Sequence, residues 1–144
     1  MLKNTDPLLN ADLLYILAAM GHGDEIAIVD ANFPAEAMTE RLVRLDGVNA
    51  TRVLEAVLSV FPLDDFVERP AAVMEVVDSP DDEPVTVREF KATAAAAEGH
   101  PIEFESVERF AFYDRTRETF AVVATGDRRL YGNVILVKGI VRPD

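Results

Sequence analysis

The sequence contains no cysteine, and only two of its 144 residues are histidines. Without cysteine there are no disulfides, no thiol nucleophile and no thiolate metal ligands. His22 and His100 lie far apart and form no HExxH pair, so no metal site is predicted. The GxGxxG, Walker and GxSxG motifs are also absent from the sequence. We therefore expect a protein that works without a bound cofactor.

Basic residues are scarce as well. Fourteen Lys and Arg residues stand against 26 Asp and Glu residues, which gives a net charge of −12. A field of this sign repels nucleic-acid phosphates and anionic membrane surfaces. No apolar run approaches the roughly 18 residues of a transmembrane helix, and residues 1–7 do not resemble a secretory signal. We expect a cytoplasmic protein that binds neither nucleic acid nor membrane.

The length predicts one domain over residues 1–144, and the 49% hydrophobic content is typical of a globular protein. Asn10 is expected to cap the first helix and Gly21 to end it. The predicted helices cover 11–20, 34–45, 51–60, an alanine-rich stretch ending at 98, and a short segment after a Ser106 cap. The predicted strands cover 26–29, 71–77, 102–105, 119–125 and 133–137. This alternation predicts an α/β domain in which helices cover a mixed sheet.

Two polar positions in the first half of the chain could take part in chemistry. Asp30 follows the apolar run 26–29, and ligands of open α/β sheets gather beyond the carboxyl ends of strands. The alternative is an aspartate that only turns the chain. His22 lies between two glycines that leave its imidazole accessible for general acid–base work, although it could equally be a surface histidine without a function. The nearby Asp24 could orient the ring or simply begin the next strand.

Two further polar groups lie in the second half of the chain. Arg109 and Tyr113 are four residues apart, so a helix would place both on one face. There they could donate hydrogen bonds to one polar ligand, or form only an exposed stacked pair. Tyr131, Gly132 and Asn133 open the last strand and suit a hydroxyl-rich ligand, with a plain turn as the alternative. Together these groups favour a neutral, hydroxyl-rich ligand and proton transfer without a cofactor.

Six segments of the chain carry a resemblance to a known family. They are Met20-Gly21-His22-Gly23-Asp24-Glu25-Ile26, Asp30-Ala31-Asn32-Phe33-Pro34, Arg109-Phe110-Ala111-Phe112-Tyr113, Thr125-Gly126, Tyr131-Gly132-Asn133-Val134-Ile135-Leu136 and Lys138-Gly139. In this order, and over Leu2 to Gly139, they resemble the L-fucose mutarotase and D-ribose pyranase family. The resemblance implies a three-layer α/β/α domain with a mixed sheet. It also implies a cofactor-independent isomerase that interconverts the α and β anomers of a reducing sugar.

The same resemblance implies roles for individual residues. His22 would be the catalytic proton donor. The implied sugar-binding residues are Asp30, Arg109, Tyr131, Gly132 and Asn133, and Tyr113 is an implied supporting residue. Independently of the resemblance, Asp24 is our candidate for the partner that sets the tautomer of His22. Members of the family are ring-shaped decamers in which neighbouring subunits share each pocket. The Tyr131 segment would then serve the His22 of a neighbour.

At two positions the chain resembles the fucose mutarotase branch of that family. Ribose pyranases have a histidine in place of Arg109 and an alanine in place of Gly132, so the resemblance implies L-fucose as the substrate. Two other functions stay open: a non-catalytic sugar-binding or sensing module, and the pyranose–furanose isomerisation of ribose. The acidic loop 78–84 and the alanine-rich helix depart from the family's pattern, and both lie outside its motifs.

Overall fold

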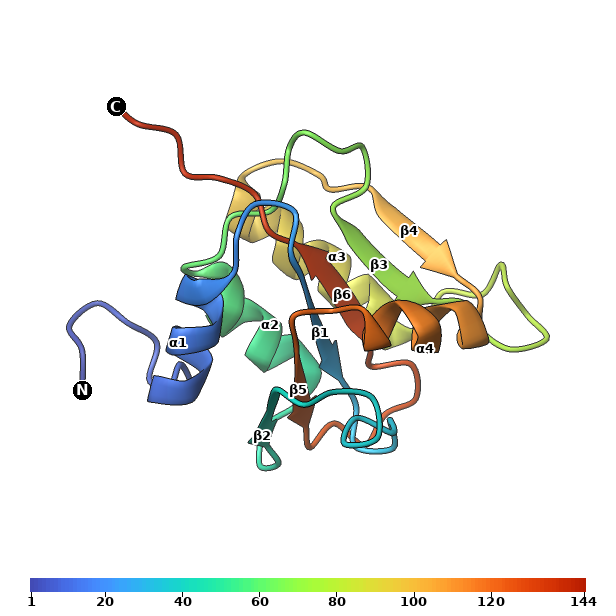
Figure 1. Cartoon of the computed structure of the whole chain (residues 1–144). Coiled ribbons are helices and arrows are strands. Elements are labelled where there is room, and N and C mark those ends of the chain that lie inside the picture. The colour runs from blue at the N-terminus through green and yellow to red at the C-terminus, as the bar shows by residue number, and fades with distance from the viewer.

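The computed structural model describes residues 1–144 and contains four helices and a six-stranded sheet (Figure 1). The helices are α1 (Ala11–Ala19), α2 (Ala50–Leu58), α3 (Val85–Glu98) and α4 (Arg109–Arg117). The strands are β1 (Glu25–Val29), β2 (Leu42–Leu45), β3 (Ala71–Met74), β4 (Phe104–Val107), β5 (Ala121–Thr125) and β6 (Val134–Val137). No helix has the length and apolar character that crossing a membrane requires.

The strand β6 runs opposite to its neighbours. The strands are ordered β2-β5-β1-β6-β3-β4, and β6 pairs antiparallel with both β1 and β3, whereas the other pairs are parallel. The predicted mixed sheet is thereby confirmed. The amino end of β6 lies at the same edge as the carboxyl ends of the other strands. This edge gathers Asp30 after β1, Arg109 after β4 and Asn133 before β6.

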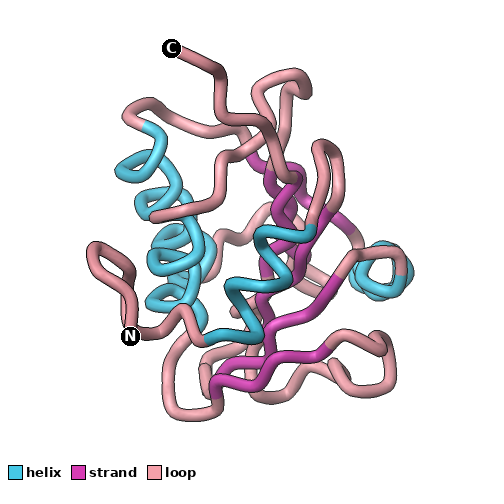
Figure 2. The backbone as a smooth tube through the Cα atoms, turned by 60° about the vertical axis from the view of Figure 1, so that its left-hand side comes forward, coloured by secondary structure: helices cyan, strands magenta, loops and turns pink.

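The alternation of side chains along the central strands divides the apolar core into two layers. Ile26 and Ile28 of β1 pack into a large cluster with α1, α2 and α3. Ala27 and Val29 face the other way, into a smaller cluster with Phe112 of α4. Figure 2 shows α4 on one side of the strands and the other helices across the sheet. The expected three-layer α/β/α arrangement is confirmed.

The first helix begins as predicted but ends differently. Asn10 Oδ1 accepts a hydrogen bond from the backbone N–H of Leu13 at 2.9 Å, which caps α1. The prediction that Gly21 ends the helix is wrong, because the chain already becomes extended at Met20. Lys138 Nζ instead donates to two carbonyl oxygens near the end of α1, one of them that of Met20. These contacts replace the backbone bonds of a glycine cap.

The predicted helix over residues 34–45 is wrong. The segment forms turns and then the short strand β2, which lies at the edge of the sheet and pairs in parallel with β5. Val43 points into the core and Arg44 toward solvent, as in a half-buried strand. An alternation over only four residues is too short to predict a strand when the surrounding sequence has helical spacing. In the folded protein, pairing with β5 makes this segment a strand.

The predicted helix cap at Ser106 is also wrong. Ser106 lies within β4, and α4 begins later, after Glu108. One carboxylate oxygen of Glu108 accepts hydrogen bonds from the backbone N–H groups of Phe110 and Ala111, both at 3.0 Å. A carboxylate satisfies these free donors and also interacts favourably with the positive end of the helix dipole. The cap thus places Arg109 in the first turn of α4.

Replacing Phe112 by alanine is expected to destabilise the protein by about 3–5 kcal/mol. Phe112 is fully buried and anchors α4 against the small cluster, so its removal leaves a cavity under that helix. Urea unfolding would measure the loss. Tyr15→Ala on α1 is the control, because Tyr15 is an exposed aromatic residue and its removal should change stability by less than about 0.5 kcal/mol. Equal losses for the two variants would contradict the prediction.

Candidate functional site

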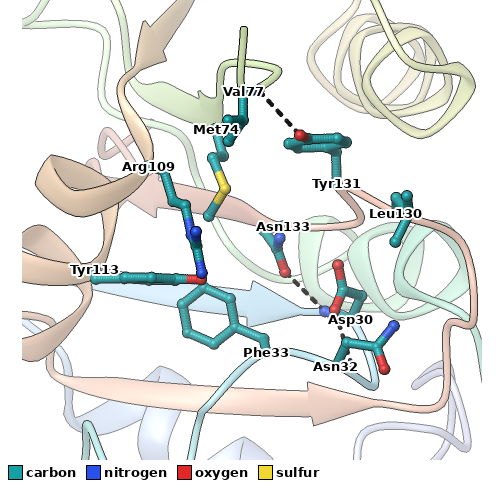
Figure 3. A pocket seen from close by; sticks show the side chains of 10 residues that line it. All are labelled: Asp30, Asn32, Phe33, Met74, Val77, Arg109, Tyr113, Leu130, Tyr131 and Asn133. Carbon is teal, nitrogen blue, oxygen red and sulfur yellow. Dashed lines mark hydrogen bonds between the residues drawn. The ribbon is translucent and has the colours of Figure 1, made fainter.

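A cavity of about 300 Å³ opens at the edge of the sheet where β1, β3 and β4 end and β6 begins (Figure 3). This volume lies at the lower end of the range for small-molecule sites. The lining residues are Asp30, Asn32, Phe33, Met74, Val77, Arg109, Tyr113, Leu130, Tyr131 and Asn133. Five of the residues singled out from the sequence therefore meet in one cavity: Asp30, Arg109, Tyr113, Tyr131 and Asn133.

Asp30 is the most buried charged group in this cavity, with 5% of its surface exposed. Its carboxylate accepts hydrogen bonds from the backbone N–H groups of Asn32 at 3.0 Å and Gly132 at 3.2 Å. Its own N–H donates to Asn133 Oδ1 at 2.9 Å. Burial raises the pKa of Asp30 above its ordinary value, although these hydrogen bonds oppose the rise. The carboxylate thus has lone pairs left to accept further hydrogen bonds from a ligand.

Gly132 adjoins the cavity without lining it. A Cβ atom built on this residue would lie 3.2 Å from the Cβ of Asp30, closer than most real contacts of this kind. The absence of a side chain therefore lets the backbone of the β5–β6 loop approach Asp30. Gly132 therefore lies next to the cavity residue Asp30.

Arg109 and Tyr113 share one face of α4, as their spacing predicted. Arg109 Nε donates a hydrogen bond to the hydroxyl oxygen of Tyr113 at 3.1 Å, and its guanidinium lies 5.4 Å from the centre of the tyrosine ring. No carboxylate forms an ion pair with Arg109, so its terminal N–H groups are available to a ligand. Both residues line the cavity.

The opposite wall of the cavity is mostly apolar. Met74, Val77 and Leu130 contribute aliphatic side chains to it, and Tyr131 lies between them in Figure 3. The Tyr131 hydroxyl oxygen accepts a hydrogen bond from the backbone N–H of Val77 at 3.0 Å, which fixes the ring. The cavity therefore presents hydrogen-bonding groups on one side and hydrocarbon on the other.

His22 lies at the far end of the sheet from the cavity. It precedes β1, whereas Asp30 follows β1, and the five residues of this strand alone span about 13 Å. The side chain of His22 is 38% exposed, and its ring packs edge-on against Phe66 with centres 4.9 Å apart. One copy of the chain therefore does not bring His22 together with the residues that line the cavity.

Asp64 is a partner of His22 that the sequence did not reveal. Its Oδ1 lies 2.9 Å from His22 Nε2, and the aspartate is only 4% exposed. The same oxygen accepts a hydrogen bond from the backbone N–H of Phe66 at 3.0 Å. The suggestion that Asp24 orients the ring is wrong, because the Asp24 carboxylate instead accepts from the N–H of Gly21 at 2.7 Å.

No group of three or more His, Asp or Glu side chains is placed to hold a metal ion.

The segment from residue 3 to residue 141 matches the RbsD / FucU transport protein family. The chain is 44% identical over 140 residues to the L-fucose mutarotase of Glaesserella parasuis serovar 5 (strain SH0165), covering 97% of this chain and 96% of that protein. It is 45% identical over 146 residues to the fucose mutarotase of Homo sapiens, with coverages of 97% and 94%.

A solved structure agrees with these relatives. The fucose mutarotase from Streptococcus pneumoniae, determined in complex with L-fucose, superposes with a TM-score of 0.88. It is 39% identical in sequence, and the match covers 98% of this chain and 100% of that one. Since the family match and the related proteins all span nearly the whole chain, the protein belongs to the RbsD / FucU transport protein family.

Proposed function

We propose that the protein is a cofactor-independent mutarotase, an isomerase that interconverts the α and β anomers of L-fucose. The observation that carries this proposal is the two-sided cavity, with Asp30, Arg109 and Asn133 on one side and aliphatic side chains on the other. The hydroxyls of a sugar both donate and accept hydrogen bonds, and a 6-deoxy sugar adds a methyl group that suits an apolar wall. The relatives named as fucose mutarotases, and the neighbour that holds L-fucose, support this choice of substrate.

The polar residues complement each other as ligands of a sugar. Asp30 accepts hydrogen bonds from hydroxyls and Arg109 donates to their oxygens. Asn133 uses its Oδ1 for the N–H of Asp30, which leaves its NH₂ group to donate to the sugar. Tyr131 offers a ring face to the C–H surface of the sugar, and Tyr113 steadies the Arg109 guanidinium. These contacts fix the sugar while its ring opens and closes.

His22 and Asp64 supply the proton chemistry in this proposal. Opening the pyranose ring requires a proton on the ring oxygen and the loss of one from the anomeric hydroxyl, and reclosure on the other face gives the second anomer. The Asp64 carboxylate accepts from the N–H at His22 Nε2, which leaves Nδ1 to take the proton of the anomeric hydroxyl and to return it to the ring oxygen, directly or through a bound water. Asp64 also stabilises the imidazolium that forms. No electron or group leaves the sugar, so no cofactor is required.

Because His22 and the cavity lie at opposite ends of β1, we infer that one copy's His22 acts on the sugar held by another copy. Exposed apolar side chains near His22 and near the cavity support contacts between copies. They are Phe66 and Val67 near His22, and Phe110 and Leu130 at the cavity. By family resemblance we propose a ring-shaped decamer in the cytoplasm. Sedimentation velocity of the purified protein tests the assembly, and a stable monomer would contradict it.

NMR exchange spectroscopy on the anomeric protons of equilibrated L-fucose tests the proposed activity. Exchange is measured with and without the protein for L-fucose, and for D-ribose and D-galactose at the same concentration. Faster α/β exchange for L-fucose is the expected result. Binding of L-fucose without faster exchange would instead indicate a sensing module, and ring-size exchange of D-ribose alone would indicate a pyranase. The absence of any effect on the three sugars would refute the proposal.

Sugar affinity is expected to weaken as the pH falls through the raised pKa of Asp30. Burial raises this pKa, so protonation begins at a higher pH than for an ordinary aspartate. A protonated carboxyl group loses acceptor capacity toward the sugar hydroxyls. The dissociation constant of L-fucose, measured between roughly pH 4 and pH 7, should therefore rise toward acid. Asp30→Asn should bind weakly with no such rise, and an equally steep rise in that variant would contradict the assignment.

A further inference from the structure

Tyr131 has a backbone conformation that residues other than glycine rarely adopt. Its φ angle is +60°, in the left-handed region. It lies in the β5–β6 loop (residues 126–133), which contributes Tyr131 and Asn133 to the cavity and Gly132 to its edge. Such a conformation persists only where surrounding contacts hold it. One contact comes from the cavity residue Asp30, which accepts from the N–H of Gly132, and the others come from side chains that do not line the cavity.

Thr86 on α3 holds the backbone of Tyr131 directly. Its hydroxyl donates to the carbonyl oxygen of Tyr131 at 2.9 Å and also lies 3.4 Å from that of Leu130. Thr86 is fully buried, so no water can replace this donor at the same place without a rearrangement. The contact ties the most strained residue of the loop to the first turn of α3.

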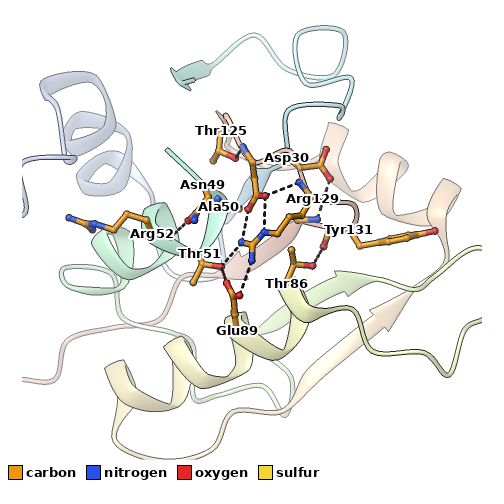
Figure 4. A network of polar contacts seen from close by, with 12 residues as sticks. Asp30, Asn49, Ala50, Thr51, Arg52, Thr86, Glu89, Thr125, Arg129 and Tyr131 are labelled. Carbon is orange, nitrogen blue, oxygen red and sulfur yellow. Dashed lines mark hydrogen bonds and ion pairs between the residues drawn. The ribbon is translucent and has the colours of Figure 1, made fainter. Parts of the chain in front are cut away.

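Arg129 ties the same loop to two helices (Figure 4). Its guanidinium donates to both carboxylate oxygens of Asp127, at 3.0 and 2.9 Å. It also donates to Glu89 of α3 at 2.8 Å and lies 3.4 Å from the hydroxyl oxygen of Thr51 on α2. Asp127 in turn accepts from the N–H of Ala50, at the amino end of α2. One loop side chain thus joins α2, α3 and the β5–β6 loop.

Asp127 is the buried charge of this network, whereas Arg129 and Glu89 are partly exposed. Asp127 is 2% exposed, and burial acts to raise its pKa. The hydrogen bonds from Arg129 and from the N–H of Ala50 outweigh that effect, so the pKa is lowered and the carboxylate stays ionised. Buried ion pairs contribute little net stability, and their better attested role is to select one conformation among several. Here the selected conformation is that of the β5–β6 loop.

We propose that Thr86, Arg129, Asp127 and Glu89 are positioning residues of the sugar site, holding the β5–β6 loop so that Tyr131, Gly132 and Asn133 face the ligand. The identity of the ligand as L-fucose rests on the proposed function, whereas the positioning of the loop does not. None of the four residues touches the reacting atoms or lines the cavity. They therefore set the affinity for the sugar and leave the proton-transfer step unchanged.

Two conservative variants test this role. Thr86→Val keeps the shape of the side chain and removes its donor, and Arg129→Lys keeps the charge and removes the planar fork. The matched control is Arg128→Lys, the same substitution at the adjacent, exposed arginine, which forms no ion pair. We expect the KM and Kd for L-fucose to rise about tenfold in both test variants, with kcat nearly unchanged and the control at wild-type values.

Hydrogen exchange of the Gly132 amide supplies a readout that needs no activity. This N–H donates to Asp30, so a loosened loop should exchange it faster in Thr86→Val and Arg129→Lys than in the control. Unchanged exchange and unchanged KM in Thr86→Val would overturn the proposal. So would a loss of thermal stability with KM and Kd intact, because that pattern indicates a purely structural role.

The test also separates this inference from the proposed function. If wild-type protein neither binds L-fucose nor accelerates its exchange, the proposed function fails, and the Gly132 amide still decides whether the network holds the loop. If Arg129→Lys does not fold, Thr86→Val and Glu89→Gln test the proposal instead. Glu89 is partly exposed, so its replacement leaves no buried charge without a partner.

Discussion

Replacing His22 by glutamine is expected to lower the rate of anomer exchange by about 10²- to 10⁴-fold, the usual contribution of a general acid–base group. Glutamine cannot exchange a proton near neutral pH, yet it keeps a polar side chain of similar reach. The proposed sugar-binding groups lie elsewhere, so the Kd for L-fucose should change little. NMR exchange rates and a separate binding titration would measure the two effects.

His100→Gln is the matched control, because His100 is exposed and its ring forms a hydrogen bond only with the carbonyl oxygen of Pro101. It should retain wild-type exchange. Asp64→Asn should lower kcat less than His22→Gln does, since it removes the charge that orients the ring and leaves the imidazole in place. Near-normal exchange in His22→Gln would end the assignment of this residue.

Two inactive variants are expected to restore each other's activity when they are refolded together. One variant is His22→Gln, and the other is Arg109→Ala, which removes a donor from the cavity. If each site combines the histidine of one copy with the cavity of another, random assembly of an equimolar mixture leaves about a quarter of the sites intact. The recovered exchange rate, relative to wild type at the same concentration, measures that fraction.

The control mixture combines His22→Gln with the double variant His22→Gln/Arg109→Ala. It contains no intact histidine and should recover nothing. If the first mixture also recovers nothing although native mass spectrometry shows mixed assemblies, each site must be built within a single chain. That result would require His22 and the cavity to approach each other across the length of β1.

The sequence predicted the cavity well because its residues follow local rules. Asp30 comes after an apolar strand, and the carboxyl ends of parallel strands meet at one edge. Arg109 and Tyr113 needed only helical spacing to lie together, and Tyr131-Gly132-Asn133 directly precedes β6. Each of these positions is fixed by its own element, so a correct assignment of the elements places the side chains. The exceptions were the helix predicted over residues 34–45, the cap predicted at Ser106 and the helix end predicted at Gly21.

The contacts that escaped prediction join segments that are distant in the sequence. Asp64 is separated from His22 by 42 positions, and Arg129 from Glu89 by 40. No local pattern marks an aspartate that will contact a histidine after folding. Asp24 was predicted as the partner only because it lies two positions from His22 in the sequence. Pairings of this kind depend on how loops pack across the sheet, and a single sequence carries no periodic signal for them.

The position of β6 has a consequence for how the chain reaches this fold. In the strand order, β6 alone connects β2, β5 and β1 on one side with β3 and β4 on the other, yet it is the last of the six strands to be synthesised. Until residue 137 is available, the earlier segments can form two partial sheets with open, apolar edges. Such late, non-local closure slows folding and exposes edges that aggregate. The final strand is therefore the one that closes the sheet, and Asn133 takes its place beside Asp30 only when it does.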